Sequence, residues 1–228
     1  MAYNLNNKLV IAISSRALFD LEEENHIFEK DGLEAYYKYQ LENEDKALKK
    51  GTGYRLVENI LKINNSFLKD EKEVEVIILS KNNAATSLRI TNAINELKLD
   101  IVRSAWTSGT NISNYLKAFK VDLFLSADEE DVLNAIENGV AAAKILPSNE
   151  DINNTSNEQV RIAFDGDAVL FSEESELIYK NNGLDAFIEH EKLNKDNPLE
   201  MVPFAKLLLI IAKIQAKFPT DKSPIRTA

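Results

Sequence analysis

The sequence contains no cysteine, which excludes disulfide bonds, thiol catalysis and zinc sites built on thiolates. Its two histidines, His26 and His190, are too few for a metal site made of imidazole ligands. Basic residues are also scarce, since 27 lysines and arginines face 37 aspartates and glutamates and the net charge is −10. Proteins that bind nucleic acids carry clustered Lys and Arg to displace counterions. We therefore expect no nucleic-acid partner.

Long apolar runs are missing as well. The first ten residues contain no apolar core of signal-peptide length. The most hydrophobic run, 207–212, is too short to span a bilayer and is flanked by Lys206 and Lys213. With 44% hydrophobic and 28% charged residues, the 228-residue chain has the composition of an ordinary globular protein. These features predict a cytoplasmic protein without a membrane partner.

Two carboxylates one residue apart stand between two apolar runs, in the sequence V-R-I-A-F-D-G-D-A-V-L-F over residues 160–171. The first run is short and rich in branched and aromatic residues, which is typical of a buried strand in a parallel sheet. Asp165 and Asp167 would then follow the carboxyl end of that strand, where open α/β sheets bind ligands. Gly166 permits a tight turn between them. The alternative is a strand that ends in a plain Asp-Gly turn.

The spacing of Asp165 and Asp167 also bears on metal binding. Two carboxylates held this close repel each other unless a cation or a shared proton lies between them. Mg²⁺ prefers one or two carboxylates together with phosphate oxygens of a substrate. Because apolar runs frame the motif on both sides, we favour the functional interpretation and predict a Mg²⁺ site at Asp165 and Asp167.

The chain also contains an internal repeat. At one constant offset Ser14 aligns with Asp165 and Gly32 aligns with Gly183. Identical residues recur at this offset, without a gap, at Ile11, Ala12, Ala17, Glu22, Glu23, Gly32, Leu33, Ala35, Asn43, Asp45, Leu48, Leu56, Ile60, Lys62, Ile63 and Phe67. We infer two tandem copies of one α/β unit. The second copy is incomplete, because Ala228 aligns with Ile77.

In the first copy, apolar strand patterns alternate with helical patterns, which predicts a Rossmann-like parallel sheet. Strands are expected over 9–13, 74–79, 101–106, 121–125 and 141–146, and helices over 33–40, 56–63, 85–97, 112–119 and 132–138. Residues 49–53 are expected to form a loop. The predicted domains are a first repeat over 1–147, a linker rich in Asn, Ser and acidic residues over 148–159, and a second repeat over 160–228.

The four apolar positions before D-x-D, with a small residue and V-L-F after it, resemble motif I of the haloacid dehalogenase superfamily of phosphotransferases. More narrowly, F-D-G-D-A-V-L-F-S-E-E-S-E and I-A-I-S-S-R-A-L-F-D are similar to the cytosolic type I 5′-nucleotidases. The resemblance continues through G-L-E-A-Y, L-S-K-N-N, Y-L-K-A-F, L-F-L-S-A-D and S-P-I-R-T. It runs over nearly the whole chain.

This resemblance implies a Mg²⁺-dependent 5′-nucleotidase that hydrolyses nucleoside 5′-monophosphates such as AMP to nucleoside and phosphate. Asp165 matches the nucleophile that forms an aspartyl phosphate, and Asp167 matches the general acid and base. Both would also hold Mg²⁺, one through its carboxylate and the other through its backbone carbonyl.

The resemblance implies three further parts: a Ser or Thr that holds the phosphate, a Lys that offsets negative charge, and acidic residues further along the chain that complete the metal shell. None of the three is present within the second copy. The first copy has Ser80, Lys117 and Asp128 at those places, but Ser14 and Arg16 stand where the two aspartates belong. Arg16 could meet a phosphate or a carboxylate with two hydrogen bonds. The candidate substrate contacts of this copy are Ser14, Arg16, Ser80 and Asn82. The alternative is a solvated scaffold, with Lys117 and Asp128 at loop ends.

The missing parts keep a rival interpretation open, in which the chain is a truncated or non-catalytic nucleotide-binding protein of the same family. The edge of the sheet left by residues 225–228 would then tend to pair with another chain and give a homo-oligomer. Three tyrosines over 36–39 are expected to pack in a helix rather than to stack on a base.

Overall fold

The computed structural model describes residues 4–68, 71–147, 159–164, 174–194 and 202–228. The chain separates into two compact units, Met1–Val160 and Arg161–Ala228. The predicted linker, 148–159, lies almost entirely outside the described residues, so its boundaries stay a prediction. In the part of the chain that the structure describes, no helix combines the length and the apolar character needed to cross a membrane.

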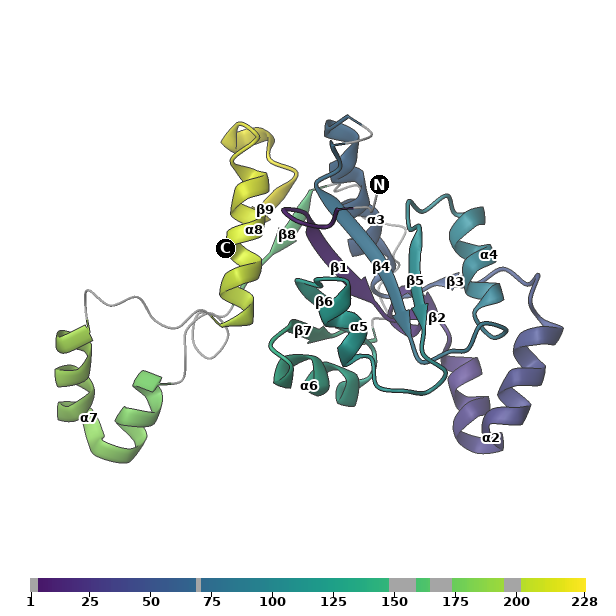
Figure 1. Cartoon of the computed structure of the whole chain (residues 1–228), viewed down its shortest axis with the longest axis horizontal. Coiled ribbons are helices and arrows are strands. Elements are labelled where there is room, and N and C mark those ends of the chain that lie inside the picture. Colours follow the sequence, from purple (N-terminus) through teal and green to yellow (C-terminus); the bar gives the residue numbers. More distant parts are fainter. Residues whose placement is uncertain (1–3, 69–70, 148–158, 165–173, 195–201) are drawn as a thin grey trace. The chain divides into compact units, whose positions relative to one another are not determined.

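A five-stranded parallel sheet forms the centre of the first unit, with the strand order β5-β4-β1-β6-β7 (Figure 1). Its strands are β1 (Leu9–Ile13), β4 (Val74–Ser80), β5 (Arg103–Trp106), β6 (Leu123–Ser126) and β7 (Ala141–Lys144). All residues of β1, β4 and β6 are buried, as expected for strands that are covered on both faces. The predicted α/β architecture is therefore confirmed.

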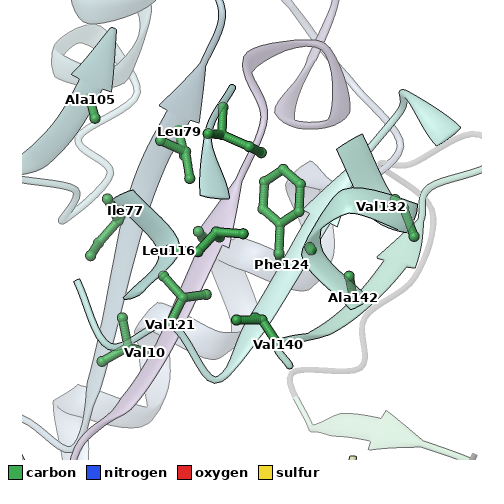
Figure 2. Close-up of a cluster of buried hydrophobic side chains, with 13 residues drawn as sticks. Val10, Ile77, Leu79, Ala105, Leu116, Val121, Phe124, Val132, Val140 and Ala142 are labelled. Atoms are coloured by element: carbon green, nitrogen blue, oxygen red, sulfur yellow. The ribbon is translucent and has the colours of Figure 1, made fainter. Parts of the chain in front are cut away.

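Helices cover both faces of this sheet. The helices of the first unit are α1 (Ser15–Leu18), α2 (Glu22–Glu42), α3 (Tyr54–Lys62), α4 (Leu88–Glu96), α5 (Ser113–Ala118) and α6 (Glu129–Glu137). Of these, α2 does not cover the sheet, and only Glu24 and Gln40 of its residues are buried. On one face, Leu116 of α5 and Val132 of α6 pack against Val10, Leu79 and Phe124 of the strands (Figure 2). The alternate residues of β1, Ile11 and Ile13, are buried on the opposite face. We expect α3 and α4 on that face, because parallel strands are nearly always joined by right-handed crossovers.

The strand order reverses between β1 and β6. The chain runs outward from β1 through β4 to β5, returns to β6 beside β1, and continues to β7. Open α/β sheets bind ligands at such a switch point, outside the carboxyl ends of the strands. Ser14 and the residues after it leave β1 at this point.

Three local expectations differ from the structure. The helix predicted over 33–40 is the second arm of a longer helix, because α2 begins at Glu22 and is kinked at Gly32. Residues Lys49–Lys50 do not form a loop but a short strand, β3, antiparallel to β2 (Phe19–Asp20). Helix α4 starts at Leu88 rather than at residue 85, because Asn83 and Thr86 exchange side-chain and backbone hydrogen bonds in a turn before it.

Strand β8 (Val160–Ile162) begins at the boundary, and the second unit continues with α7 (Glu174–Asn194), α8 (Pro203–Gln215) and β9 (Ile225–Thr227). Short 3₁₀ turns lie at Ile63–Ser66 in the first unit and at Thr220–Lys222 in the second. The amide of Ala228 donates to the carbonyl of Ile162 at 3.0 Å, and the amide of Phe164 donates to the carbonyl of Ala228 at 2.9 Å. This pattern is a parallel ladder in which Ala228 lies opposite Ala163.

The internal repeat extends to this register. In the first unit β1 and β4 pair in parallel with Ala12 opposite Ile77. These two residues are the counterparts of Ala163 and Ala228 in the repeat. The kinks agree too, because Gly32 in α2 has φ 83° and ψ −177°, and Gly183 in α7 has φ 82° and ψ −179°. The second unit thus reproduces the beginning of the first.

We predict that Gly32→Ala lowers the free energy of unfolding by about 1–3 kcal/mol, because this backbone conformation is accessible almost only to glycine. No atom lies within 4 Å of an added Cβ, so the cost is conformational rather than steric. Urea unfolding followed by the fluorescence of Trp106, the single tryptophan, reports on the first unit. The control is Lys30→Ala, at an exposed position of the same helix. Equal effects of the two substitutions would contradict the assignment of strain to Gly32.

Candidate active site

Polar residues follow β1, β4 and β6 where these strands end at the carboxyl edge of the first unit's sheet. Ser14, Ser15 and Arg16 come after β1, and Ser80 and Asn82 stand at the end of β4. Because the three strands are neighbours, the structure brings these residues to one edge. The structure also shows what each of these side chains contacts, whereas their proposed role as substrate contacts stays a prediction.

Ser14 begins helix α1. Its hydroxyl accepts a hydrogen bond from the amide of Ala17 at 3.3 Å, and its own amide donates to the carbonyl of Leu125 in β6 at 2.9 Å. The residue is buried and in the extended conformation typical of an N-cap. The hydroxyl at the position that aligns with Asp165 therefore stabilises the start of a helix.

Ser15 rather than Ser14 faces the end of β4. The hydroxyl oxygens of Ser15 and Ser80 are 3.0 Å apart, and the amide group of Asn82 donates to Ser15 at 3.4 Å. The hydroxyl of Tyr36 in α2 donates to the side-chain oxygen of Asn82 at 2.6 Å and accepts from the amide group of Gln40 at 3.0 Å. Burial raises the pKa of the Tyr36 hydroxyl above its ordinary value, so it stays protonated.

A buried ion pair continues this chain of contacts. Arg89 in α4 and Glu24 in α2 are each 4% exposed, and their side chains meet at 2.5 Å. Arg89 also donates to the side-chain oxygen of Gln40 at 3.4 Å and to the backbone carbonyl of Lys46 at 3.0 Å. We name the connected set the buried polar network: Ser15, Glu24, Tyr36, Gln40, Ser80, Asn82 and Arg89. It ties both arms of the kinked helix to the carboxyl edge of the sheet.

Arg16 forms a two-pronged ion pair with Glu22. Its Nε lies 2.8 Å from Oε1 of Glu22, and one terminal nitrogen lies 3.1 Å from Oε2. The hydrogen bond from Arg16 lowers the pKa of the Glu22 carboxyl, and the same bond raises the pKa of Arg16. The sequence allowed a phosphate or a carboxylate as the partner of Arg16, and the structure has a carboxylate. A phosphate would reach this guanidinium only by displacing Glu22.

The other first-copy residues aligned with catalytic parts have structural surroundings. Asp128 caps α6, where its carboxylate accepts from the amide of Asp131 at 3.0 Å. Lys117 is exposed on α5. Lys81, which sequence reasoning did not single out, lies 2.8 Å from the carboxylate of Asp131 and links the end of β4 to α6. Burial raises the pKa of Asp131, and Lys81 offsets part of that shift.

Asp165 and Asp167 lie outside the described residues, so their predicted roles stay predictions. The described residue before them, Phe164, extends the parallel ladder of β8, as Ile13 precedes Ser14 in β1. The two carboxylates are hard oxygen donors and fit Mg²⁺ chemically, whereas Arg16 at the aligned position of the first unit adds a cation and does not. Within the described ranges, no group of three or more His, Cys, Asp or Glu side chains is arranged to hold a metal ion.

Comparisons with known proteins identify the family of the chain. The family model described as 5′-nucleotidase matches residues 1–228. The chain belongs to the 5′-nucleotidase family. It is 36% identical over 229 aligned positions to human cytosolic 5′-nucleotidase 1B. The match covers 97% of this chain but only 37% of that relative. The chain therefore spans little more than a third of the relative's length. No solved structure matches it significantly.

Sequence reasoning missed Ser15, Tyr36, Gln40, Glu24 and Arg89 as parts of this edge. Only Arg89 left a signal, because it lies in the sequence beside the apolar residues that bury α4, namely Ile90, Ala93 and Ile94. A charge in that position needs a buried partner. The sequence does not reveal which acid supplies it, since Glu24 is far away along the chain.

We predict that Glu24→Gln lowers the free energy of unfolding by about 3–5 kcal/mol, because the substitution leaves the charge of Arg89 buried without its counter-ion. The matched control is Glu22→Gln, the same substitution in the more exposed pair with Arg16, which should cost less than about 1 kcal/mol. Urea unfolding followed by Trp106 fluorescence measures both. Similar costs for the two variants would rule out a special contribution from the buried pair.

Proposed function

We propose that the protein containing this chain is a Mg²⁺-dependent 5′-nucleotidase that hydrolyses nucleoside 5′-monophosphates, AMP among them, to nucleoside and phosphate. The observation that supports it most is the D-G-D motif directly after β8, in a chain of the 5′-nucleotidase family. The parallel ladder of β8 and β9 repeats the register of β1 and β4, whose carboxyl edge is the ligand-binding edge of an open α/β sheet. A carboxylate at Asp165 would therefore follow the carboxyl end of its strand, which is the end where such sheets bind ligands.

In the proposed reaction, a carboxylate oxygen of Asp165 attacks phosphorus, and the bond from phosphorus to the 5′ oxygen of the nucleoside breaks. Asp167 donates the proton that this oxygen needs to leave as a hydroxyl group. Asp167 then takes a proton from water, whose oxygen attacks the phosphorus of the aspartyl phosphate. Phosphate is released and the Asp165 carboxylate is restored. Bound Mg²⁺, held by Asp165 and Asp167, would neutralise phosphate charge throughout.

For the first unit we propose a scaffolding role. Ser14 caps a helix, Ser80 and Asn82 are joined to Ser15, and Arg16 is held by Glu22. A role of these four residues as substrate contacts stays a prediction, and each would have to exchange an internal hydrogen bond for one to the substrate. The Ser14 and Arg16 side chains supply neither an aspartyl nucleophile nor a carboxylate ligand.

We further propose a cytosolic location, because the human relative is named a cytosolic enzyme. A neighbouring strand is also expected beside β9. Its counterpart β4 has partners on both sides, whereas β9 pairs in the described part of the chain with β8 alone. Either a longer polypeptide or a second chain could supply that strand.

Phosphate release from AMP tests the proposal. We expect release that requires Mg²⁺, and we expect Asp165→Asn to reduce it by about 10⁴- to 10⁶-fold, because the nucleophile cannot be replaced by neighbouring groups. The matched control is Asp185→Asn, at an exposed position on α7, which should leave the rate unchanged. Turnover that survives Asp165→Asn, or that does not depend on Mg²⁺, would refute this mechanism. No release at all would favour a non-catalytic member of the family.

The scaffolding role of the first unit has its own test. We expect Arg16→Met to leave the KM for AMP unchanged, because Glu22 already satisfies the guanidinium. Steady-state kinetics measures this, with Asp165→Asn as the inactive reference. A large rise in KM with unchanged kcat would instead identify Arg16 as a substrate contact.

A further inference from the structure

The second arm of α2, which follows the kink, carries its large apolar side chains on the outside. Leu33, Tyr37 and Leu41 are 63%, 39% and 38% exposed. Their spacing of four residues sets them in one row along the helix, which we name the apolar row. The arm is attached to its unit through a polar side chain instead, since Gln40 is buried and belongs to the buried polar network. A helix that packs on its own domain shows the reverse pattern, with its apolar residues inside.

The buried polar network gives this arm a fixed support, although the helix does not cover the sheet (Figure 1). The hydroxyl of Tyr36 donates to Asn82 at 2.6 Å and accepts from Gln40 at 3.0 Å. Shortly after the end of the helix, Arg89 donates to the backbone carbonyl of Lys46 at 3.0 Å. Single exposed apolar residues are common on protein surfaces, but a row of them is typical of a surface that binds another protein. Because the helix is already ordered, little conformational entropy is lost when a partner binds.

Charged residues of alternating sign run beside the apolar row. Glu34, Lys38 and Glu42 each follow a member of the row by one position, and all three are exposed. The Nζ atom of Lys38 lies 3.8 Å from Oε1 of Glu42, and these two side chains are 75% and 62% exposed. Such an exposed ion pair contributes little to the stability of one chain. The alternation restricts which helix can lie alongside, because a partner needs the opposite sign at each position.

We propose that a second copy of this chain covers the apolar row, with the two arms packed antiparallel about a two-fold axis. Such an axis forms every contact between two different residues twice, once in each direction. With Tyr37 beside its own counterpart, Leu33 lies opposite Leu41 of the second copy, and Glu34 comes within reach of Lys38 of the second copy. A parallel alignment would instead bring Glu34 to Glu34 and Lys38 to Lys38. The charges therefore select the antiparallel alignment.

The corresponding arm of α7 lacks this self-complementary pattern. Leu184 and Ile188 align with the first two members of the apolar row and are 57% and 39% exposed. The residues one position further, Asp185 and Glu189, are both acidic, and Lys192 stands where the row has its third member. Two such arms would repel each other in either direction, because like charges would meet. We therefore assign the contact to α2.

The contact between the two arms is small. An arm of about ten residues is about 15 Å long, and interfaces well below the standard size are typical of transient association. We therefore expect a dimer that dissociates on dilution. This association is independent of the proposed nucleotidase reaction.

Sedimentation velocity of the 228-residue chain over a dilution series measures the dissociation constant of the dimer. We expect Leu33→Glu to raise that constant by at least about tenfold, because two apolar contacts are lost and like charges are added. The matched control is Leu184→Glu, the same substitution at the aligned exposed position of α7, which should leave the constant unchanged. Circular dichroism checks that each variant folds as the unaltered chain does.

An exchange of charges tests the direction of the two arms. Lys38→Glu should raise the dissociation constant about tenfold, because Glu34 of the other copy then meets a like charge on both sides of the axis. Combining it with Glu34→Lys restores opposite charges and should return the constant to within about twofold of the value for the unaltered chain. The ion pair with Glu42 stays broken in the double variant, so the recovery reports on the contact between copies.

A chain that stays monomeric at every concentration would overturn the proposal, since the apolar row is then covered within the chain or by a different partner. A dimer that survives Leu33→Glu forms through another surface and would overturn it as well. So would equal weakening by Leu33→Glu and Leu184→Glu, or a failure of the double variant to recover. Dimerisation that weakens in Leu33→Glu and in Lys38→Glu and returns in the double variant supports the antiparallel contact.

Discussion

The parallel pairing of the first strand with its neighbour is the interaction on which the rest of each unit depends. In the first unit β1 lies between β4 and β6, and its last residue, Ile13, delivers the chain to the switch point of the sheet. The second unit repeats the register, with Ala228 opposite Ala163. A slip of one residue would turn every side chain of the strand to the other face. In the first unit the register therefore determines that Ser14 is the residue that leaves the strand at the carboxyl edge.

The carboxyl edge of the first unit's sheet is occupied by polar side chains that bond to one another. In the first unit the polar side chains are joined to one another: Ser15 to Ser80, Asn82 to Tyr36, and Glu24 to Arg89. Such a network is stable only when nearly all of its members are satisfied, because an isolated polar group is costly in a region of low dielectric constant. A ligand would have to replace several of these bonds at once. The second unit has two aspartates in the sequence where the first has Ser14 and Arg16, and their role as a site for Mg²⁺ stays a prediction.

Much of the fold followed from the sequence, and the reason is local. The strands β1 and β4 are short and mostly apolar, and the repeat in the sequence relates the two units. The kinked helix was harder to predict, because a glycine such as Gly32 is typical of a helix end, although α2 continues after it. The short pairing of Phe19–Asp20 with Lys49–Lys50 and the ion pair of Glu24 with Arg89 join distant segments, and no local pattern identifies such partners. For the active site, the motif supplied Asp165 and Asp167, which stay predictions because they lie outside the described residues.

The kink glycines carry a consequence for the history of the chain. Gly32 and Gly183 share one backbone conformation that other residues rarely adopt, although the first unit has a serine and an arginine where the second has its two aspartates. If the copies arose by duplication of one ancestral segment, the bent arm was inherited by both and outlasted the loss of the carboxylates in one of them. Because the bend at Gly32 is present in a copy that lacks the two aspartates, we attribute the bend to the fold and not to the reaction. The bent arm therefore belongs to the folding requirements of the module, whereas the residues that follow the first strand differ between its two copies.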